Sequence, residues 1–197
     1  MKSSTHDQIR SITGIGLFTA IVFILQLAGS FIKFGPFSIS LVLIPIVVGA
    51  AVYSNRMFGA GAWLGTVFGI AVLISGDASA FIMINPVGTF LTVIFKGMLA
   101  GLAVDLLYGL LKKCNKYIRV IICACVCPIV NTGLFLLGCR LFFFRTVTEW
   151  AGGDNVFKYM ITGLVGMNFI FELALNLIVS PGIVRIIDIG LSSRKRR

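Results

Sequence analysis

Apolar residues occur along the chain in six long runs that are separated by short polar breaks. A helix needs roughly 20 residues to cross the hydrocarbon core of a bilayer. We therefore expect an all-α, polytopic membrane protein with six transmembrane helices, at residues 11–31, 39–53, 57–75, 86–111, 120–144 and 159–189. The pair Asn85-Pro86 is typical of a helix start, with asparagine as the N-cap and proline in the first turn. The longest polar stretch, residues 145–158, is expected to be a loop.

Lysine and arginine residues concentrate in every second break between these runs. The basic breaks hold Lys2 and Arg10, then Arg56, then the cluster from Lys112 to Arg119, then Arg185 and the basic residues 194–197. The breaks between them carry mixed charge. Loops rich in lysine and arginine normally stay in the cytoplasm. The pattern predicts a single membrane domain, residues 1–197, with both termini in the cytoplasm and a location in the cell membrane.

Composition agrees with this prediction. Apolar residues make up 58% of the chain and charged residues 12%. The net charge of +10 is then a signal of topology and gives no reason to expect nucleic-acid binding, although the basic tail can contact anionic lipid headgroups. The first apolar run is longer than the core of a signal peptide, and no cleavage motif follows it, so we expect it to remain as a helix.

The sequence lacks the combinations of residues that common catalytic or metal sites need. The only histidine is His6, in the polar leader, and there is no P-loop. Four of the five cysteines lie in or at the edge of an apolar run, where they are expected to be small packing residues. We therefore expect no enzymatic activity, no cofactor and no metal.

Two stripes of small residues occur at four-residue spacing. Gly61, Gly65 and Gly69 form one stripe in the third run, and Gly16 and Ala20 form the other in the first run. Small residues at this spacing let two helix backbones approach closely. The stripe in the third run fits packing inside the bundle. The stripe in the first run fits equally well a contact with another membrane protein.

Polar residues within the runs point to a binding site or to buried pairs, because they are costly in a bilayer. Lys96 lies roughly 15 Å below the start of its helix at 1.5 Å per residue, near the middle of the membrane. Asn168, Glu172 and Asn176 share one face of the sixth helix, because they follow one another at intervals of four residues. A Lys96–Glu172 ion pair is expected, either as a structural pair or as part of a ligand site. Asp105 reaches the inner interface, where we expect it to be solvated.

Three segments resemble the substrate-capturing S component of energy-coupling-factor (ECF) vitamin transporters. Residues 16–20 resemble the small-xxx-small motif on its first helix, residues 38–50 its second helix, and residues 59–69 its glycine-rich third helix. The chain departs from the family at Gly16, where alanine is usual, and in the break Ser-Asn-Arg-Met-Phe-Gly before the third helix, where a Gly-Pro-Lys-like turn is usual.

The resemblance implies a transport subunit without catalytic activity of its own. Such a subunit binds a vitamin in a pocket open to the outside and docks through its first helix, here Gly16 and Ala20, onto a transmembrane T component that carries two ATPase subunits. ATP hydrolysis then drives release of the vitamin inward.

The polar residues can be placed around such a pocket. Lys96, Asn131, Arg140, Asn168 and Glu172 are expected to ring a cavity in the outer and middle bilayer. The residues expected at its mouth are Phe34, Phe37, Asp77, Asn85 and Trp150. Lys96 and Arg140 together favour an acidic ligand such as pantothenate, with riboflavin, cobalamin, folate or a thiamine precursor as alternatives. The competing hypothesis is a bundle with a structural or assembly role, whose charges merely pair with one another.

Overall fold

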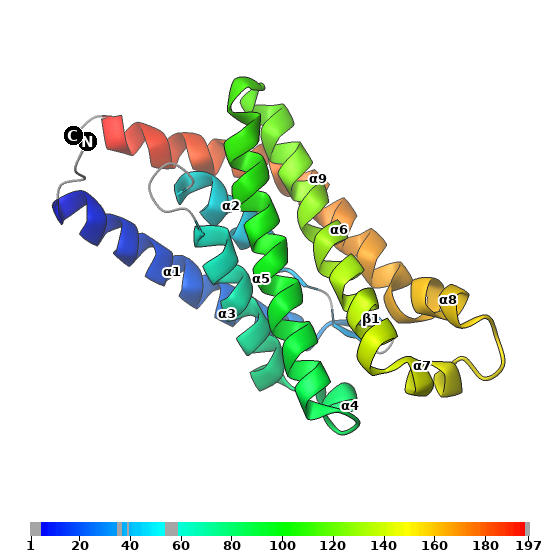
Figure 1. Ribbon diagram of the computed structural model, residues 1–197. Helices are drawn as coiled ribbons and strands as arrows, with labels where there is room; N and C mark the ends of the chain where they lie inside the picture. The colour runs from blue at the N-terminus through cyan, green and yellow to red at the C-terminus, as the bar shows by residue number, and fades with distance from the viewer. Residues whose placement is uncertain (1–4, 35–36, 39, 54–58, 196–197) are drawn as a thin grey trace.

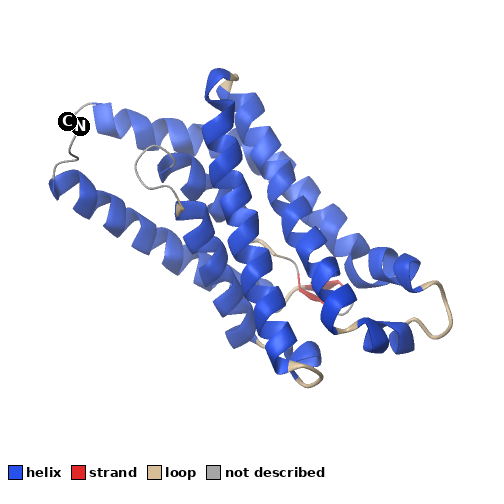
Figure 2. Cartoon of the chain, viewed as in Figure 1, coloured by secondary structure: helices blue, strands red, loops and turns tan. Residues whose placement is uncertain are grey.

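The computed structural model describes residues 5–34, 37–38, 40–53 and 59–195, and this part of the chain is almost entirely helical (Figures 1 and 2). Its elements in chain order are α1 (Thr5–Gly29), β1 (Lys33–Phe34), β2 (Phe37–Ser38), α2 (Leu43–Tyr53), α3 (Ala60–Ser75), α4 (Ser79–Ile82), α5 (Pro86–Leu110), the 3-10 helix η1 (Leu111–Lys113), α6 (Lys116–Phe142), α7 (Phe144–Trp150), α8 (Val156–Tyr159), the π-helix η2 (Met160–Val165) and α9 (Gly166–Lys195).

Four helical segments are long and apolar enough to cross a membrane. They are Ser11–Gly29, Pro86–Lys113, Lys116–Phe142 and Val156–Ile187. Two further apolar helices, α2 and α3, are shorter. The prediction of an all-helical membrane protein with six apolar segments is confirmed at this level.

Local capping explains where several helices begin. The Asn85 side chain accepts a hydrogen bond from the backbone N–H of Gly88 (2.9 Å), and α5 starts at Pro86 as predicted. Asn115 caps α6 in the same way, through the N–H of Tyr117 (2.9 Å). This cap makes α6 begin inside the basic break, four residues before the predicted start. Pro45 lies in the first turn of α2, where the backbone N–H groups have no helical partner.

The stretch 145–158 is not the loop that its polarity predicts, because it contains α7 and α8. Phe143, Val147 and Ala151 are all buried at four-residue spacing, so they give α7 one apolar face among charged neighbours. The turn that follows α7 uses Gly152 and Gly153 at positive φ (59° and 98°), a conformation that glycine adopts without steric cost.

Helices α3 and α5 pack backbone against backbone along the glycine stripe of the third run. A Cβ atom on Gly61 would lie 2.5 Å from the carbonyl oxygen of Gly101, and one on Gly69 would lie 2.8 Å from a backbone oxygen of α5. Gly65 and Gly97 face each other so closely that a Cβ on either would overlap the carbonyl of the other. Packing inside the bundle, one of the two uses of such a stripe, is therefore confirmed for α3.

Asp105 on α5 caps the start of α3, and the prediction that it is solvated is wrong. Its side chain is buried (3% exposed), and its two oxygens accept hydrogen bonds from the backbone N–H groups of Gly61 and Ala62 (3.1 Å each). These N–H groups belong to the first turn of α3 and have no partner within their own helix. The close glycine contact brings the carboxylate within reach of them.

The connecting segments gather at the two ends of the bundle (Figure 1). The β1–β2 hairpin, α4, α7 and α8 lie at one end. The two termini and η1, which is part of the basic break, lie at the other. The hairpin is antiparallel, with Lys33 opposite Ser38 and Phe34 opposite Phe37.

Candidate functional site

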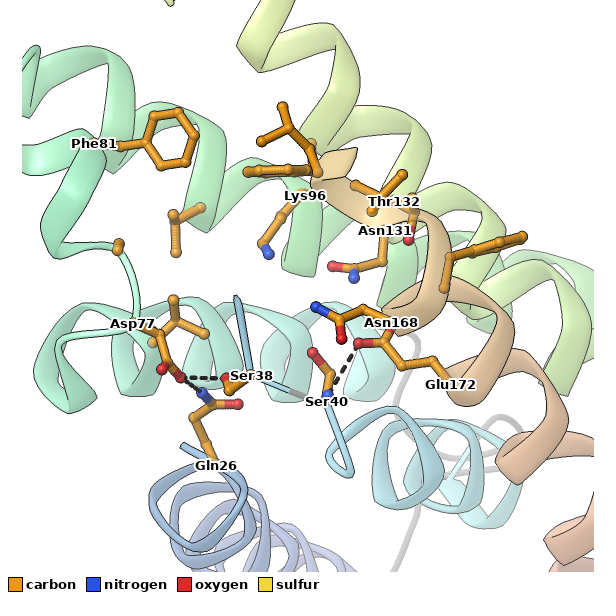
Figure 3. Close-up of a pocket in the computed structure, with 17 residues that line it drawn as sticks. Gln26, Ser38, Ser40, Asp77, Phe81, Lys96, Asn131, Thr132, Asn168 and Glu172 are labelled. Atoms are coloured by element: carbon orange, nitrogen blue, oxygen red, sulfur yellow. Dashed lines mark hydrogen bonds between the residues drawn. The ribbon is translucent and has the colours of Figure 1, made fainter. Parts of the chain in front are cut away.

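A cavity opens at the end of the bundle that carries the hairpin and α4, and it holds about 670 Å³ of space with its mouth included. Its polar lining residues are Gln26, Ser38, Ser40, Asp77, Lys96, Asn131, Thr132, Asn168 and Glu172. Its apolar lining residues are Val72, Ala78, Phe81, Val93, Phe135, Leu164, Val165 and Phe169. An apolar wall with a few convergent polar groups is typical of a small-molecule site, and Figure 3 shows these groups directed toward a common space.

Helix α9 contributes the polar face that the four-residue spacing predicted. Asn168 and Glu172 line the cavity and are buried (7% and 5% exposed). Asn176, one turn further along, is fully buried and donates a hydrogen bond to the backbone oxygen of Glu172 (2.8 Å). The π-helix η2 directly precedes α9, and its residues Leu164 and Val165 complete this wall.

Lys96 points into the cavity from α5, between two aromatic rings. Its ammonium nitrogen lies 5.5 Å from the ring centre of Phe68 and 5.2 Å from that of Phe135, close enough for cation–π attraction. Among the residues that the structure describes, no carboxylate comes within ion-pair distance of it. The predicted ion pair between Lys96 and Glu172 is therefore not formed, although both residues line the same cavity.

Glu172 is engaged by the chain segment that follows the hairpin. Its Oε1 accepts a hydrogen bond from the backbone N–H of Ser40 (3.0 Å). This bond holds the segment against α9 at the floor of the cavity (Figure 3).

Asp77 joins three elements beside the cavity, one of which is strand β2 of the hairpin. Its Oδ2 accepts hydrogen bonds from Gln26 Nε2 on α1 (2.6 Å), from Ser38 Oγ on β2 (2.7 Å) and from Ser75 Oγ at the end of α3 (3.2 Å). Asp77 therefore fixes how α1 and the hairpin meet the cavity.

Asn131 on α6 faces the cavity without a hydrogen-bond partner among the described residues. Its side chain is 4% exposed and its Oδ1 has no hydrogen bond. Nor does its amide nitrogen have a partner among the residues with described positions. Buried amides are nearly always hydrogen-bonded, so this side chain is an exception that needs an explanation.

The aromatic side of the cavity is built around Phe81 of α4. Its ring is buried and packs edge-on against Phe135 (5.8 Å between ring centres), Phe143 (4.7 Å) and Trp150 (5.5 Å). Trp150, predicted at the mouth, thus lies behind Phe81 and does not line the cavity.

The structure brings Asp77, Lys96, Asn131, Asn168 and Glu172 together, and Asn85, Arg140 and Trp150 do not line the cavity. Asn85 is a helix cap. Phe34 and Phe37 form the hairpin through their backbones, and their side chains lie outside the described part of the chain.

Arg140 is exposed and stacks on Phe144 and Phe157, with its guanidinium carbon 4.1 and 5.4 Å from the ring centres. It follows Asn131 by nine residues on α6, a rotation of about 900° at roughly 100° per residue, so it points to the opposite face. Helical spacing alone, read from the sequence, could therefore have shown that Arg140 does not share a cavity with Asn131.

Several lining residues were missed by sequence reasoning. Gln26 is buried (2% exposed) and was detectable as an amide within an apolar run. Ser38 and Ser40 carried no signal, because they lie at the start of what reads as the second helix. Within the described ranges, no group of three or more potential metal ligands is present.

The small residues of α1 face away from the bundle. Gly16 and Ala20 are exposed, and a Cβ on Gly16 would meet no other atom within 4 Å. The opposite side of α1 packs on α2, where Phe18 and Tyr53 stack edge-on (6.2 Å between ring centres). A Cβ on Gly14 would overlap the Tyr53 hydroxyl.

The family to which the chain belongs accounts for these features. Residues 10–184 match the family model described as ECF transporter, substrate-specific component. No curated protein and no solved structure matches the chain. The family match confirms the resemblance seen in the three sequence segments. Members of the family are multi-pass membrane subunits that bind a substrate for uptake and are not enzymes. The chain is therefore a member of the substrate-specific (S) components of ECF transporters.

Proposed function

We propose that this S component captures a water-soluble vitamin or a related micronutrient outside the cell for ATP-driven uptake. The observation that carries the proposal is the cavity, in which polar groups from α5, α6 and α9 converge under an aromatic wall. Its size and mixed lining suit one small organic molecule.

The orientation of the cavity supports capture from outside. The cavity is lined by Ser38 of β2 and Phe81 of α4, and these elements lie at the end of the bundle opposite to η1 and its basic cluster (Figure 1). Lysine- and arginine-rich loops normally stay in the cytoplasm, which would turn the hairpin, α4 and the cavity toward the exterior.

Docking through α1 is the second part of the proposal. Gly16 and Ala20 form an exposed strip of small residues on a helix that also packs on α2 and α3. Small residues allow a helix of another subunit to approach the backbone closely. We expect the T component to bind there, with its two ATPase subunits on the cytoplasmic side.

The charges around the cavity do not favour an acidic ligand. An acidic ligand was expected from Lys96 and Arg140 together, but Arg140 is exposed, stacks on Phe144 and does not line the cavity. Lys96 shares the cavity with Asp77 and Glu172, so one formal positive charge stands against two negative ones. The arrangement of hydrogen-bonding groups in the cavity therefore distinguishes between candidate ligands better than the net charge of the cavity does.

The competing hypothesis, a purely structural bundle, would require its buried polar groups to pair with one another. Neither Lys96 nor Asn131 does so among the described residues. The direct experiment is to purify the full chain, denature it and identify the released small molecule by mass spectrometry. Equilibrium binding, and uptake into vesicles that also contain the T component and ATPases, would follow. We expect about one vitamin per chain and uptake that depends on ATP. The absence of both would contradict the proposal.

A further inference from the structure

We infer that Asn131 determines ligand specificity by pairing with a ligand edge that presents a hydrogen-bond donor and an acceptor side by side. Lactams, cyclic imides and amino-substituted nitrogen heterocycles carry such an edge. The inference rests on the proposed function and deepens it, because it assigns a chemical class to the occupant of the cavity.

The first observation is the unpaired state of the Asn131 amide. A buried amide without hydrogen bonds destabilises the folded protein, because its donor and acceptor have lost water without gaining another partner. Asn131 is 4% exposed and makes no hydrogen bond with the described part of the protein. The cost is removed when a bound molecule supplies the missing partners.

The second observation is the chemistry of a primary amide. It holds an N–H donor and a C=O acceptor in one plane. Such a group pairs in a two-bond fashion with a matching planar edge, as asparagine does with adenine. An amide rotated by 180° offers the same pair of groups, since the donor and the acceptor only exchange places.

The third observation is the setting of the amide in the cavity. Figure 3 shows Asn131 directed into the space between Lys96 and Asn168. Phe135, one helical turn along α6, and Phe81 supply an apolar wall on which a flat ring can lie. A planar ring would thus meet a donor–acceptor pair at Asn131 and a further donor at Lys96.

An open-chain secondary amide does not satisfy this geometry. In its trans form, the N–H and the C=O point in opposite directions, so they cannot both reach one side-chain amide. The single amide of pantothenate is of this kind, which makes pantothenate a suitable negative probe. Riboflavin has a cyclic imide, folate has a pterin lactam, and the aminopyrimidine precursor of thiamine has an amino group beside a ring nitrogen.

The test measures binding of these four compounds to the purified full chain and to three variants. Asn131→Leu removes both amide functions at similar volume, and Asn131→Asp removes the donor. Gly133→Leu is the matched control, because Gly133 is exposed on the same helix and a Cβ there would meet nothing within 4 Å. Melting curves without ligand are recorded for each protein.

We expect one of the three edge-bearing probes to bind, and pantothenate not to bind. Affinity for that probe should fall about 10- to 100-fold in Asn131→Leu and in Asn131→Asp and stay unchanged in Gly133→Leu. The ligand-free melting temperature of Asn131→Leu should equal or exceed that of wild type, whereas a structural role would lower it.

Two results would overturn the inference and leave the proposed function intact. One is tight binding of pantothenate with none of the three ring compounds. The other is wild-type affinity in Asn131→Leu. If none of the four compounds binds, the inference fails, whereas the proposed function is decided separately by the molecule released from the purified chain and by ATP-dependent uptake.

Discussion

The backbone contact between α3 and α5 allows a sharp test of how this bundle is held together. We predict that Gly97→Ala destabilises the protein, although alanine is the better helix former. A Cβ on Gly97 would overlap the carbonyl oxygen of Gly65 and lie 3.1 Å from its carbonyl carbon and 3.2 Å from Cδ1 of Phe68. Two of these atoms belong to the backbone and cannot rotate away, so the helices must separate.

Gly109→Ala is the matched control. Gly109 lies on the same helix, and a Cβ there would meet nothing within 4 Å. Both variants gain about 1 kcal/mol of helix propensity, so their difference isolates the steric cost. Forcing an extra carbon into a packed interface costs about 1–3 kcal/mol. At about 2–4 °C per kcal/mol for a chain of this size, Gly97→Ala should melt about 2–12 °C below Gly109→Ala.

Thermal unfolding in detergent, followed by circular dichroism and by tryptophan fluorescence, measures this difference. Gly65→Ala tests the same contact from α3 and should show a similar loss. The reasoning is refuted if Gly97→Ala melts at or above the temperature of Gly109→Ala.

Further predictions concern the cavity, the docking helix, the cap and the orientation. Lys96→Met should weaken binding of the co-purified vitamin by about 2–5 kcal/mol with little change in melting temperature; unchanged affinity with a destabilised fold would remove Lys96 from the site. Gly16→Leu should prevent assembly with the T component, measured by co-purification, while vitamin binding persists, and a working complex at normal yield would contradict this. Asp105→Ala should lower stability by about 0.5–2 kcal/mol through loss of the α3 cap, whereas Asp154→Ala, at an exposed position, should not. In intact cells a membrane-impermeant maleimide should label Asp154→Cys and not the exposed native Cys114; the reverse labelling would invert the topology.

The helices were predictable because their signals are local. Apolar run length and the Asn85-Pro86 cap placed α5 within one residue of its observed ends. The same kind of reasoning failed for α7, whose apolar face is made by three residues dispersed among charged ones. It also failed for α2, because Pro45 has a role in the first turn that the apolar run does not reveal.

The site was predictable only where spacing fixes direction. Asn168 and Glu172 share a helix face by periodicity alone, and both line the cavity. Which face of α5 or α6 turns inward depends on contacts with other helices. Asp105 illustrates this. Its sequence position predicts a solvated carboxylate at the membrane interface, and only the glycine contact between α5 and α3 explains why it is buried. Ser40 reaches the cavity through a backbone N–H, a group that is present at almost every position and so leaves no trace in the sequence.

The π-helix η2 has a consequence for insertions and deletions. A π-helical turn holds about one residue more than an α-helical turn, and Gly166 accordingly lies close to the carbonyl oxygen of Ile161, 3.1 Å from a Cβ placed on it. Deleting one residue between Met160 and Val165 would let α8 and α9 join as a regular α-helix. Because the π-helical turn contains the extra residue within itself, Asn168 and Glu172 would keep their direction toward Lys96 after such a deletion. A one-residue deletion in this segment should therefore be tolerated far better than one between Gly166 and Asn168, where the helix is regular and every residue beyond the deletion would turn by roughly 100°.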